Sequence, residues 1–425
     1  MRSADNRSLR IFIHILNDDS LLTIFSFCRP VLIDEDETDE LLGLRRGHWD
    51  SEVSERWWYK LTHVCKRWRD LVLNSASYLD LCLLCTYGMP VADMLAHSPQ
   101  LPLVIAFPDE LHHRDIAKDD EGIKLALQQR DHVCRVRVRM FEPMLSKFIK
   151  DLDREFPILE YLSLRPPDKV DTAFTLPENF EAPHLRHLVL NNFVFPASPF
   201  LRRVTSLATL SVMWIPPSTY FHPNEFLRLV SLCPQLEMLR ISFQSPVANH
   251  TVEQRLSNTP ITTDVTLPYL RWISFLGASA YLEALLPRMA TPSLEKLQIW
   301  FFNQLTYSVP NLRDFTITNE NLRSNGATIK FSTEAALVKM YPHEGDMIRA
   351  LYMETFCRYL DWQVSSMVQI CNELSPMFSL VEHLTLTYEK HNPASNRRNE
   401  IPSTKWRELL RPFSHVTTLH VDLKF

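Results

Sequence analysis

Cysteine and histidine are the first residues to consider for chemistry, because thiolates and imidazoles bind metals and act as nucleophiles. Cys82 and Cys85 form a C-x-x-C pair, a spacing that in other proteins serves zinc binding or disulfide exchange. Here the pair lies in an apolar, strand-like run and has no second pair of ligands. His112-His113 is the nearest approach to a histidine cluster and lies in a charged stretch without metal-ligand spacing. We therefore expect no metal site and no redox centre.

Glycine is rare, with 7 in 425 residues, and this scarcity excludes two classes of nucleotide-dependent enzyme. Phosphate-cradling loops and dinucleotide-binding turns need closely spaced glycines so that the backbone can approach the phosphates. The sequence also lacks a G-x-S-x-G nucleophile elbow and an H-E-x-x-H zinc motif. No pair of carboxylates is marked as an acid–base couple. We predict that the protein is not an enzyme, has no catalytic residue and uses no cofactor.

Length and charge limit the possible partners. The chain of 425 residues is long enough for about three ordinary domains, or for one long repeat domain with an appendage. Its formal net charge of −5 provides no general basic field to hold a nucleic-acid backbone. No apolar window of about 18 residues occurs, so no membrane span is expected. The eight cysteines are scattered in apolar runs, as is typical of free thiols in a reducing compartment. We expect a protein of the cytoplasm, the nucleus or both, which binds neither nucleic acid nor membrane.

Two segments near the amino terminus have the spacing of short amphipathic helices. Asp18-Asp19-Ser20 offers capping oxygens, and apolar residues then recur at helical spacing over 21–28. A second apolar stripe runs from Trp57 to Val72, with lysine and arginine on its wet face. An acidic segment at 31–55, which includes Asp34–Glu40, lies between them and predicts a solvated loop. Helices this short cannot bury their stripes alone, so they need a partner or a neighbouring domain.

These residues resemble an F-box. The resemblance is carried by Leu21-Leu22-x-Ile24-Phe25-x-Phe27-Cys28 and by Leu61-x-x-Val64-Cys65-Lys66-Arg67-Trp68-Arg69-x-Leu71. The Val-Cys-Lys-Arg-Trp-Arg portion is the more specific half. The usual Leu-Pro opening is Leu16-Asn17 here, and the acidic insertion separates the two halves. An acidic, loop-extended F-box of this kind is similar to those of large F-box families in mushroom-forming (basidiomycete) fungi. The alternative is a helical cap on the repeat domain that follows.

The resemblance implies a partner for these helices. F-box helices bind a Skp-type adaptor, which connects them to the cullin scaffold of a ubiquitin ligase. By this resemblance, the adaptor-binding residues are Leu21, Leu22, Ile24, Phe25, Phe27, Leu61, Val64, Cys65, Trp68 and Leu71.

A short template, apolar-x-x-apolar-x-apolar, recurs through the rest of the chain and predicts a repeat architecture. Its ten matches begin at positions 133, 159, 185, 207, 236, 270, 294, 312, 381 and 416. In six of them a proline lies two residues before the first apolar position, where it can end a helix and extend the chain. Helical spacing between matches, as at 144–153, predicts helical connectors. Upstream, 78–85 and 101–107 have the pattern of two further strands, with a helix between them.

This template with helical connectors resembles a leucine-rich repeat, covering about residues 130–320 and 380–425. The asparagine that usually follows the strand is mostly absent. The resemblance implies an α/β fold, with an F-box-like helical domain at 1–77 and an irregular leucine-rich-repeat solenoid of parallel strands at 78–425. Residues 322–360 break the repeat and predict a strand-rich insertion, followed by a helix that leads back into the pattern.

The template also predicts which side chains lie on the open face of the strands, because alternate residues of a strand point to opposite faces. Arginine forks match carboxylates and phosphates, while exposed methionine and tryptophan are typical binding anchors. The candidate target-binding residues are Arg135, Arg137, Arg139, Arg165, Met213, Met238, Trp272 and Trp300. Two alternatives stay open. The arginines could only solubilise an edge strand or pair with Asp34–Glu40, and the tryptophans could be buried under a neighbouring connector.

The resemblance to an F-box followed by a leucine-rich repeat implies a substrate-recognition adaptor of an SCF-type cullin–RING ubiquitin ligase. The F-box would bind the Skp-type adaptor, and the repeat domain would hold an unidentified target protein. The alternative is a leucine-rich-repeat scaffold for protein interactions that engages no ligase.

Overall fold

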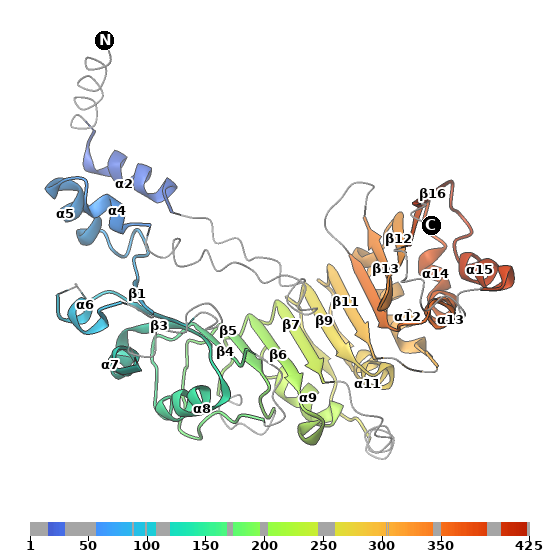
Figure 1. Cartoon of the computed structure of the whole chain (residues 1–425), viewed down its shortest axis with the longest axis horizontal. Coiled ribbons are helices and arrows are strands. Elements are labelled where there is room, and N and C mark those ends of the chain that lie inside the picture. Colours follow the sequence, from blue (N-terminus) through green and yellow to red (C-terminus); the bar gives the residue numbers. More distant parts are fainter. Residues whose placement is uncertain are drawn as a thin grey trace, which may run out of the picture.

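The computed structural model describes residues 16–29, 57–86, 89–97, 100–107, 120–167, 173–195, 203–244, 260–302, 304, 306–342, 350–388 and 401–422. The expected acidic insertion at 31–55 and His112-His113 lie outside these residues. A helical N-terminal part precedes a large, mostly parallel β-sheet with helices along one side (Figure 1). The protein is therefore of mixed α/β class, as the sequence predicts.

The first described helix, α2 (Asp18–Phe27), begins one residue earlier than the expected cap. Asn17 is the N-cap residue, and its side-chain oxygen accepts a hydrogen bond from the Ser20 N–H at 2.8 Å. Asp18 and Asp19 lie in the first turn, where their charges favour the positive end of the helix dipole.

The second apolar stripe forms two helices and not one. Helix α4 (Tyr59–Thr62) ends at His63, and α5 (Lys66–Asn74) begins after Cys65, whose backbone is extended with φ of −160°. The expectation of one continuous helix over 57–72 is therefore wrong. The break lets Trp58 and Val72, on either side of it, both reach the interior, where each is buried.

The main sheet has fourteen strands, in the order β1-β2-β3-β4-β5-β6-β7-β9-β11-β14-β13-β12-β15-β16. From β1 to β11 the neighbouring strands are all parallel. These strands are β1 (Leu83–Cys85), β2 (Leu103–Phe107), β3 (Val133–Arg139), β4 (Tyr161–Arg165), β5 (His187–Asn191), β6 (Thr209–Ile215), β7 (Met238–Phe243), β9 (Trp272–Gly277) and β11 (Lys296–Phe301). A separate parallel pair is formed by β8 (Val265–Thr266) and β10 (Met289–Ala290).

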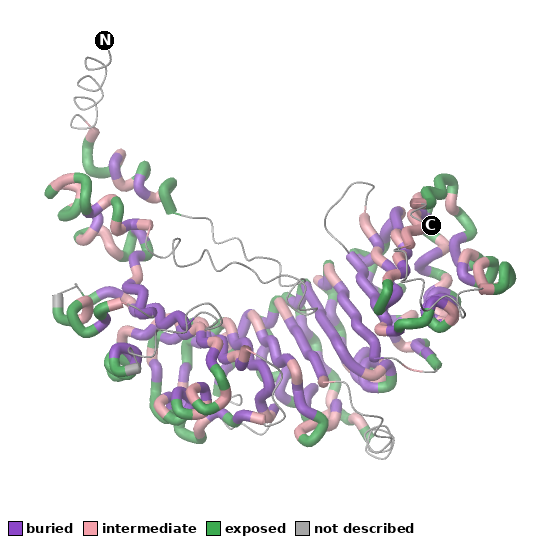
Figure 2. Tube along the Cα trace, viewed as in Figure 1, coloured by how far each residue is buried: buried purple, intermediate pink, exposed green. Residues whose placement is uncertain are grey.

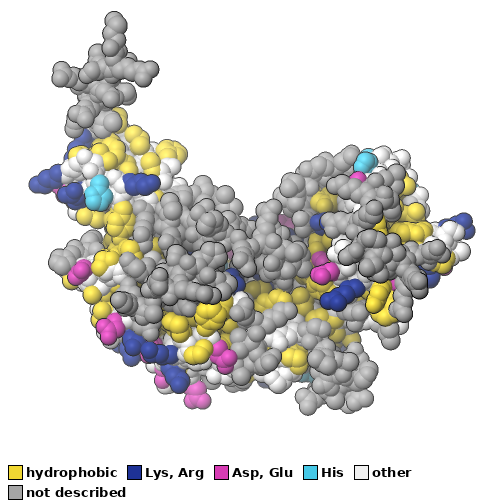
Figure 3. All heavy atoms as spheres, viewed as in Figure 1, with side chains coloured by type: hydrophobic (Ala, Val, Ile, Leu, Met, Phe, Trp, Pro, Cys, Tyr) yellow, Lys and Arg dark blue, Asp and Glu magenta, His cyan; other side chains and the backbone are white. Residues whose placement is uncertain are grey.

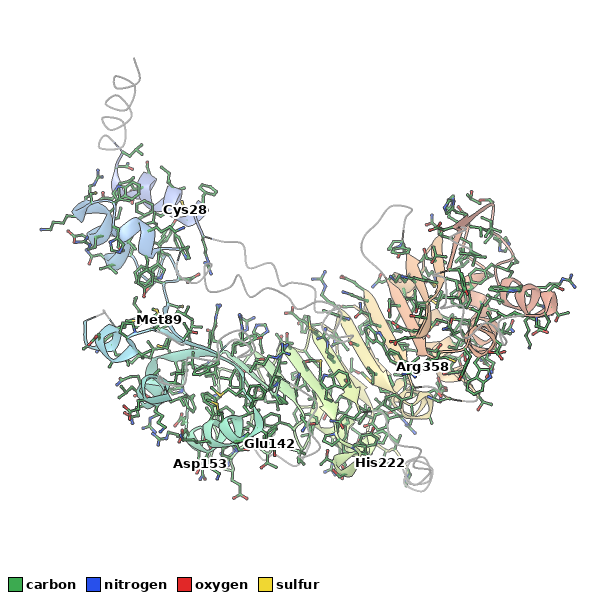
Figure 4. All side chains as sticks on the ribbon, in the orientation of Figure 1. Cys28, Met89, Glu142, Asp153, His222 and Arg358 are labelled. Carbon is green, nitrogen blue, oxygen red and sulfur yellow. The ribbon has the colours of Figure 1, made fainter. Side chains whose placement is uncertain are left out.

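Helical connectors lie along the convex side of the curved sheet (Figure 1). They include α6 (Val91–His97), α7 (Asp120–Gln128), α8 (Glu142–Asp151), α9 (Pro223–Val230), α11 (Ser279–Leu285) and α12 (Pro310–Thr318). Short 3-10 helices are η2 (Arg130–His132), η4 (Pro217–Thr219), η5 (Leu286–Arg288) and η6 (Glu320–Leu322). Figure 4 marks this side by Glu142, Asp153 and His222. His222 caps α9, because its Nδ1 accepts a hydrogen bond from the Asn224 N–H at 3.2 Å.

The core lies between this side of the sheet and the helices. Val136, Val138, Leu162 and Leu164 alternate along β3 and β4 and are buried, and the apolar template positions stay buried through β11. In β16 they do not, because Leu419 and Val421 are exposed. Figure 2 shows that burial extends through the whole central sheet. The period-two pattern therefore predicts the core face correctly.

The last strands correct the expectation of a parallel solenoid with a strand-rich insertion at 322–360. They are β12 (Gly326–Phe331), β13 (Ala335–Tyr341), β14 (Leu351–Phe356), β15 (His383–Tyr388) and β16 (Thr418–Asp422). The expected strands of 322–360 do form, but they belong to the main sheet: β14 pairs with β11, and β12 pairs with β15. Strand β13 runs antiparallel to both β12 and β14. The structure is therefore one mixed sheet and not a solenoid of parallel repeats.

The match to the repeat template that begins at Leu312 forms a helix and not a strand. Leu312 and Phe315 are buried in α12, which has Pro310 in its first turn, while Ile317 is exposed. Apolar residues three apart fit both the strand template and one face of a helix, and proline is well tolerated in the first helical turn. The helix expected after the insertion is confirmed as α13 (Leu360–Glu373), followed by α14 (Ser375–Phe378) and α15 (Ser403–Leu410).

Candidate functional site

The N-terminal helices pack against one another as a small module, and their buried side chains continue into the core of the sheet. Phe25 of α2 is fully buried, and its ring lies edge-on to Trp68 of α5 with a centroid distance of 4.7 Å. Leu21 and Val72 are buried in the same cluster. Arg67 of α5 bonds the start of α2, with its guanidinium 2.7 Å from Asp18 Oδ1 and 2.7 Å from the Leu16 carbonyl. These contacts fix α2 against α5.

The module is joined to the sheet through the segment that leads into β1. The indole N–H of Trp58 donates a hydrogen bond to the Cys82 carbonyl at 3.2 Å. Arg29, just after α2, pairs with Asp80, whose backbone has a positive φ of 49°. The helices are thus attached at one side and not enclosed by the sheet.

The module also presents apolar side chains to solvent. Ile24 is 44% exposed, Phe27 is 83% exposed and Val64, between α4 and α5, is 57% exposed. Figure 3 shows hydrophobic side chains gathered on this end of the molecule. Ile24 and Phe27 are three residues apart in α2 and therefore lie on the same side of the helix. An exposed apolar set of this kind is typical of a surface that binds a partner.

The expected adaptor-binding residues thus divide into three groups. Leu21, Phe25 and Trp68 stabilise the module from within, since they form its core or pack against it. Ile24, Phe27 and Val64 are exposed and can contact a partner directly. The remaining four are half-buried: Leu22, Leu61, Cys65 and Leu71. Sequence spacing does not separate these residues, because it does not show which face each short helix turns inward.

On the sheet, the four expected arginines lie on the face opposite the connectors. Strand register places Arg137 beside Ser163 and Arg139 beside Arg165. Each is half-buried and contacts its neighbours: the Arg137 guanidinium lies 5.6 Å from the Tyr161 ring centroid, and Arg165 Nε donates to Ser163 Oγ at 3.1 Å. Arg139 donates to the Pro167 carbonyl at 3.1 Å. Arg135 begins the same strand face, next to Tyr161.

The expected apolar anchors are mostly not exposed. Met213, Trp272 and Trp300 are all buried, and Met238 is half-buried. The expectation of exposed anchors is therefore wrong for these three residues. Both tryptophans are buried, as in the alternative, but by side chains from neighbouring strands and not by a connector.

Trp272 lies against two cations and Trp300 against a buried acid. Lys296 Nζ lies 3.8 Å, and the Arg240 guanidinium 5.2 Å, from the Trp272 ring centroid, within cation–π distance. The Trp300 indole N–H donates to Glu354 Oε2 at 3.1 Å. Side chains on adjacent parallel strands are only about 4.8 Å apart, so large ones cover each other on this face.

Glu354 is a buried carboxyl group that the sequence did not reveal. Tyr352 and Trp300 both donate hydrogen bonds to it. Burial raises the pKa of Glu354, and the two hydrogen bonds and the nearby Lys339 and Lys330 partly oppose that rise. Because Glu354 belongs to the strand-rich segment, only the pairing of β14 with β11 places it beside Trp300.

A row of side chains crosses this face from strand to strand, and we call it the central row. In register order from β4 to β14 it comprises Ser163, Val189, Ser211, Arg240, Ser274, Gln298 and Tyr352. All seven are buried. Ser211 Oγ, Ser274 Oγ and both amide atoms of Gln298 have no hydrogen-bond partner among the described residues. Buried polar groups normally have partners, so this concentration is unusual for a structural sheet face.

The C-x-x-C spacing does not describe a pair of thiols that act together. Cys85 is fully buried, and burial raises the pKa of its thiol to about 12, which disfavours the reactive thiolate. Cys82 contacts Cys134 of β3 instead: a hydrogen bond between these thiols and burial both raise the pKa of Cys134. Among the described residues, no group of three or more His, Cys, Asp and Glu side chains could hold a metal ion.

An open hollow of about 410 Å³ lies where the chain enters β4 to β7. Its lining residues are Ile158, Glu160, His184, Arg186, Ser206, Ala208, Gln235 and Glu237. The hydroxyl in this lining, Ser206 Oγ, donates to the Leu185 carbonyl at 2.8 Å and the Pro183 carbonyl at 3.2 Å. Ser206 therefore stabilises the turn into β6 and is not arranged as a nucleophile.

Comparison with known proteins gives no family for this chain. No family model matches the sequence, and no curated protein is significantly similar to it. Within the described residues, no helix is long and apolar enough to cross a membrane.

Proposed function

We propose that the protein is a substrate-recognition adaptor of an SCF-type cullin–RING ubiquitin ligase. In this role the N-terminal module is an F-box that binds a Skp-type adaptor, and the sheet face holds a target protein. The parallel strands β3 to β11 provide that face. The protein itself performs no bond chemistry, and it acts by raising the effective concentration of the target near the ligase.

The observation that carries the proposal is the two-sided apolar character of α2. Leu21 and Phe25 turn inward and build the module, while Ile24 and Phe27 stay exposed at 44% and 83%. A helix that only capped the sheet would need apolar residues on one side. The second exposed side is accounted for by a protein partner that buries Ile24, Phe27 and Val64.

Binding to a purified Skp-type adaptor tests the proposal. Ile24→Asp places a charge in the exposed apolar set without touching the module core, so we expect it to abolish binding while the protein stays folded. Ser26→Asp is the matched control, because Ser26 is two residues from Ile24 in α2 and therefore lies on the far side of the helix from it. Trp68→Ala is a poor test, since loss of the contact with Phe25 would disrupt the module itself.

The alternative is a protein-interaction scaffold that engages no ligase. Failure of the intact protein to bind any Skp-type adaptor would favour it and refute the adaptor proposal. Equal loss of binding in the Ser26→Asp and Ile24→Asp proteins would also count against the proposal, because the effect would then not depend on the exposed apolar set.

A further inference from the structure

We propose that a hollow at the junction of β14 and α13 binds an arginine side chain of a partner protein. The hollow has a volume of about 370 Å³. Its lining residues are Glu334, Phe356, Cys357, Arg358, Tyr359 and Trp362. Arg358 lies between the end of β14 and the start of α13 and is labelled in Figure 4. The site shares no residue with the surfaces proposed for the Skp-type adaptor and for the target, so it goes beyond the proposed function.

Hydrogen bonds fix the three segments that surround the hollow. The fully buried Gln363 of α13 donates through Nε2 to the Ser332 carbonyl at 2.8 Å and to the Cys357 carbonyl at 2.6 Å. The Cys357 N–H in turn donates to the Glu334 carbonyl at 2.9 Å. The turn between β12 and β13, the segment after β14 and the first turn of α13 are thereby held together. The shape of the hollow is therefore set by the fold.

Two exposed aromatic rings line one side of the hollow. Tyr359 and Trp362 are 40% and 46% exposed, and their ring centroids lie 5.5 Å apart at an interplanar angle of 72°. Single exposed aromatic residues are ordinary, but a pair of rings at a hollow offers apolar surface that a ligand can cover. The faces of such rings also attract cations. Among the described residues, cations lie over the rings of Tyr161, Trp272 and Tyr352 but not over that of Trp362, which is therefore available to a partner.

Acidic groups make a cation the favoured ligand. The exposed side chain of Glu334 has no ion pair or hydrogen bond among the described residues. Asp361, in the first turn of α13, lies close to the Cys357 thiol: burial raises the pKa of this thiol, and the Asp361 carboxylate adds to the rise. Among the residues that line the hollow, Arg358 is the only base. Two acids and one base therefore adjoin the hollow.

Arginine fits this arrangement better than lysine or a bare metal ion. Its planar guanidinium can stack on an indole and donate a fork of N–H bonds to a carboxylate at the same time, whereas an ammonium is a point charge. The volume of about 370 Å³ lies in the range of ligand sites, roughly 300–1,000 Å³, and would leave a bare ion mostly surrounded by water. Trp362 thus provides the stacking surface and Glu334 the acceptor.

Nuclear magnetic resonance of the full-length protein, labelled with ¹⁵N at the tryptophan indoles, tests the proposal. The signal of Trp362 is identified by its absence in Trp362→Phe. The probe is N-acetylarginine methylamide, and its citrulline analogue, which has nearly the same shape without the charge, is the control. We expect the arginine probe to shift the Trp362 signal with a dissociation constant in the millimolar range, and the citrulline probe to bind at least about fivefold more weakly. Added salt should weaken the binding of the arginine probe.

Two variants change the charges of the hollow and keep the Trp362 signal as the readout. Glu334→Gln should weaken binding of the arginine probe about fivefold, because it removes an exposed ion pair with the ligand. Glu121→Gln is the matched control, because Glu121 is exposed on α7 and should leave binding unchanged. Arg358→Gln should tighten binding by about twofold to fivefold, because it removes a like charge from the hollow. Binding to a Skp-type adaptor should be the same in all three proteins.

The outcomes separate an arginine site from other uses of the hollow. A shift of the Trp362 signal that saturates with the arginine probe, weakens in Glu334→Gln and strengthens in Arg358→Gln supports the proposal. An equal shift with the citrulline probe overturns it, because the hollow would then bind apolar surface without selecting charge. Weaker binding in Arg358→Gln also overturns it, since Arg358 would then contact the ligand directly. The absence of any shift at about 50 mM arginine probe refutes the site.

Discussion

Two phenylalanines on α2 provide the sharpest test of how the helical module is built. Phe25 and Phe27 have the same side chain and lie two residues apart, yet Phe25 is fully buried and Phe27 is 83% exposed. Removing a buried phenylalanine ring costs about 3–5 kcal/mol, which includes its contact with Trp68. Removing an exposed one changes stability by less than about 0.5 kcal/mol. We therefore expect Phe25→Ala to open the module and Phe27→Ala to leave it intact.

Native-state hydrogen exchange measures this difference locally. If exchange of the buried α5 amides, such as that of Val72, follows opening of the module, the loss in Phe25→Ala corresponds to about 100-fold to several thousand-fold faster exchange. The same amides in Phe27→Ala should exchange within about twofold of the unaltered protein. The strands from β4 to β11 serve as an internal control, because they do not belong to the module.

The reasoning would be refuted if the α5 amides stayed protected in Phe25→Ala, since Phe25 would then not support α5. It would also be refuted if Phe27→Ala accelerated exchange as much as Phe25→Ala. Adaptor binding should separate the two residues in a different way. Both variants should lose it, but only Phe27→Ala should lose it while its helices remain protected.

Two further predictions concern the sheet. Because burial raises the pKa of Glu354 above its ordinary 4.5, the native state holds this proton more tightly than the unfolded state. The protein should therefore lose stability relative to Glu354→Gln as pH rises from about 4.5 through the native pKa of Glu354. Denaturant midpoints of both proteins from pH 4 to pH 8 measure this loss. A difference between the two midpoints that stays constant with pH would contradict the prediction. Gly277→Ala should destabilise the core by about 1–3 kcal/mol, because the added methyl group would lie 2.8 Å from Phe275 Cζ and 3.0 Å from Phe243 Cδ2. Urea unfolding measures that loss, and unchanged stability would show that both rings can move aside.

Much of the fold follows from the spacing of apolar residues over a few positions of the chain. Alternation of apolar residues fixes which face of β3 to β11 is the core, because neighbouring side chains of a strand must point to opposite sides. Helical spacing likewise identifies α2, α8 and α13. The sequence also predicts the two early strands and the helix between them, found as β1, α6 and β2.

The pattern of apolar residues fails to predict secondary structure where the same spacing fits two structures. The template at Leu312 fits a strand as well as a helix face, and tertiary packing selects α12. The stripe over 57–72 fits a single helix, but the chain turns at Cys65 so that residues on both sides of the turn reach one core. In each case the sequence offers two local solutions of similar quality, and contacts with distant residues decide between them.

The sequence alone therefore determined the α/β class, the core face of the parallel strands and the apolar stripes at the amino terminus. Tertiary structure decided that β13 reverses direction, that Trp300 is buried beside Glu354 and that Cys82 contacts Cys134 and not Cys85. It also decided which side of α2 remains exposed. The reason is physical: spacing along the chain fixes the direction of a side chain, but only the pairing of distant strands and helices determines what covers it.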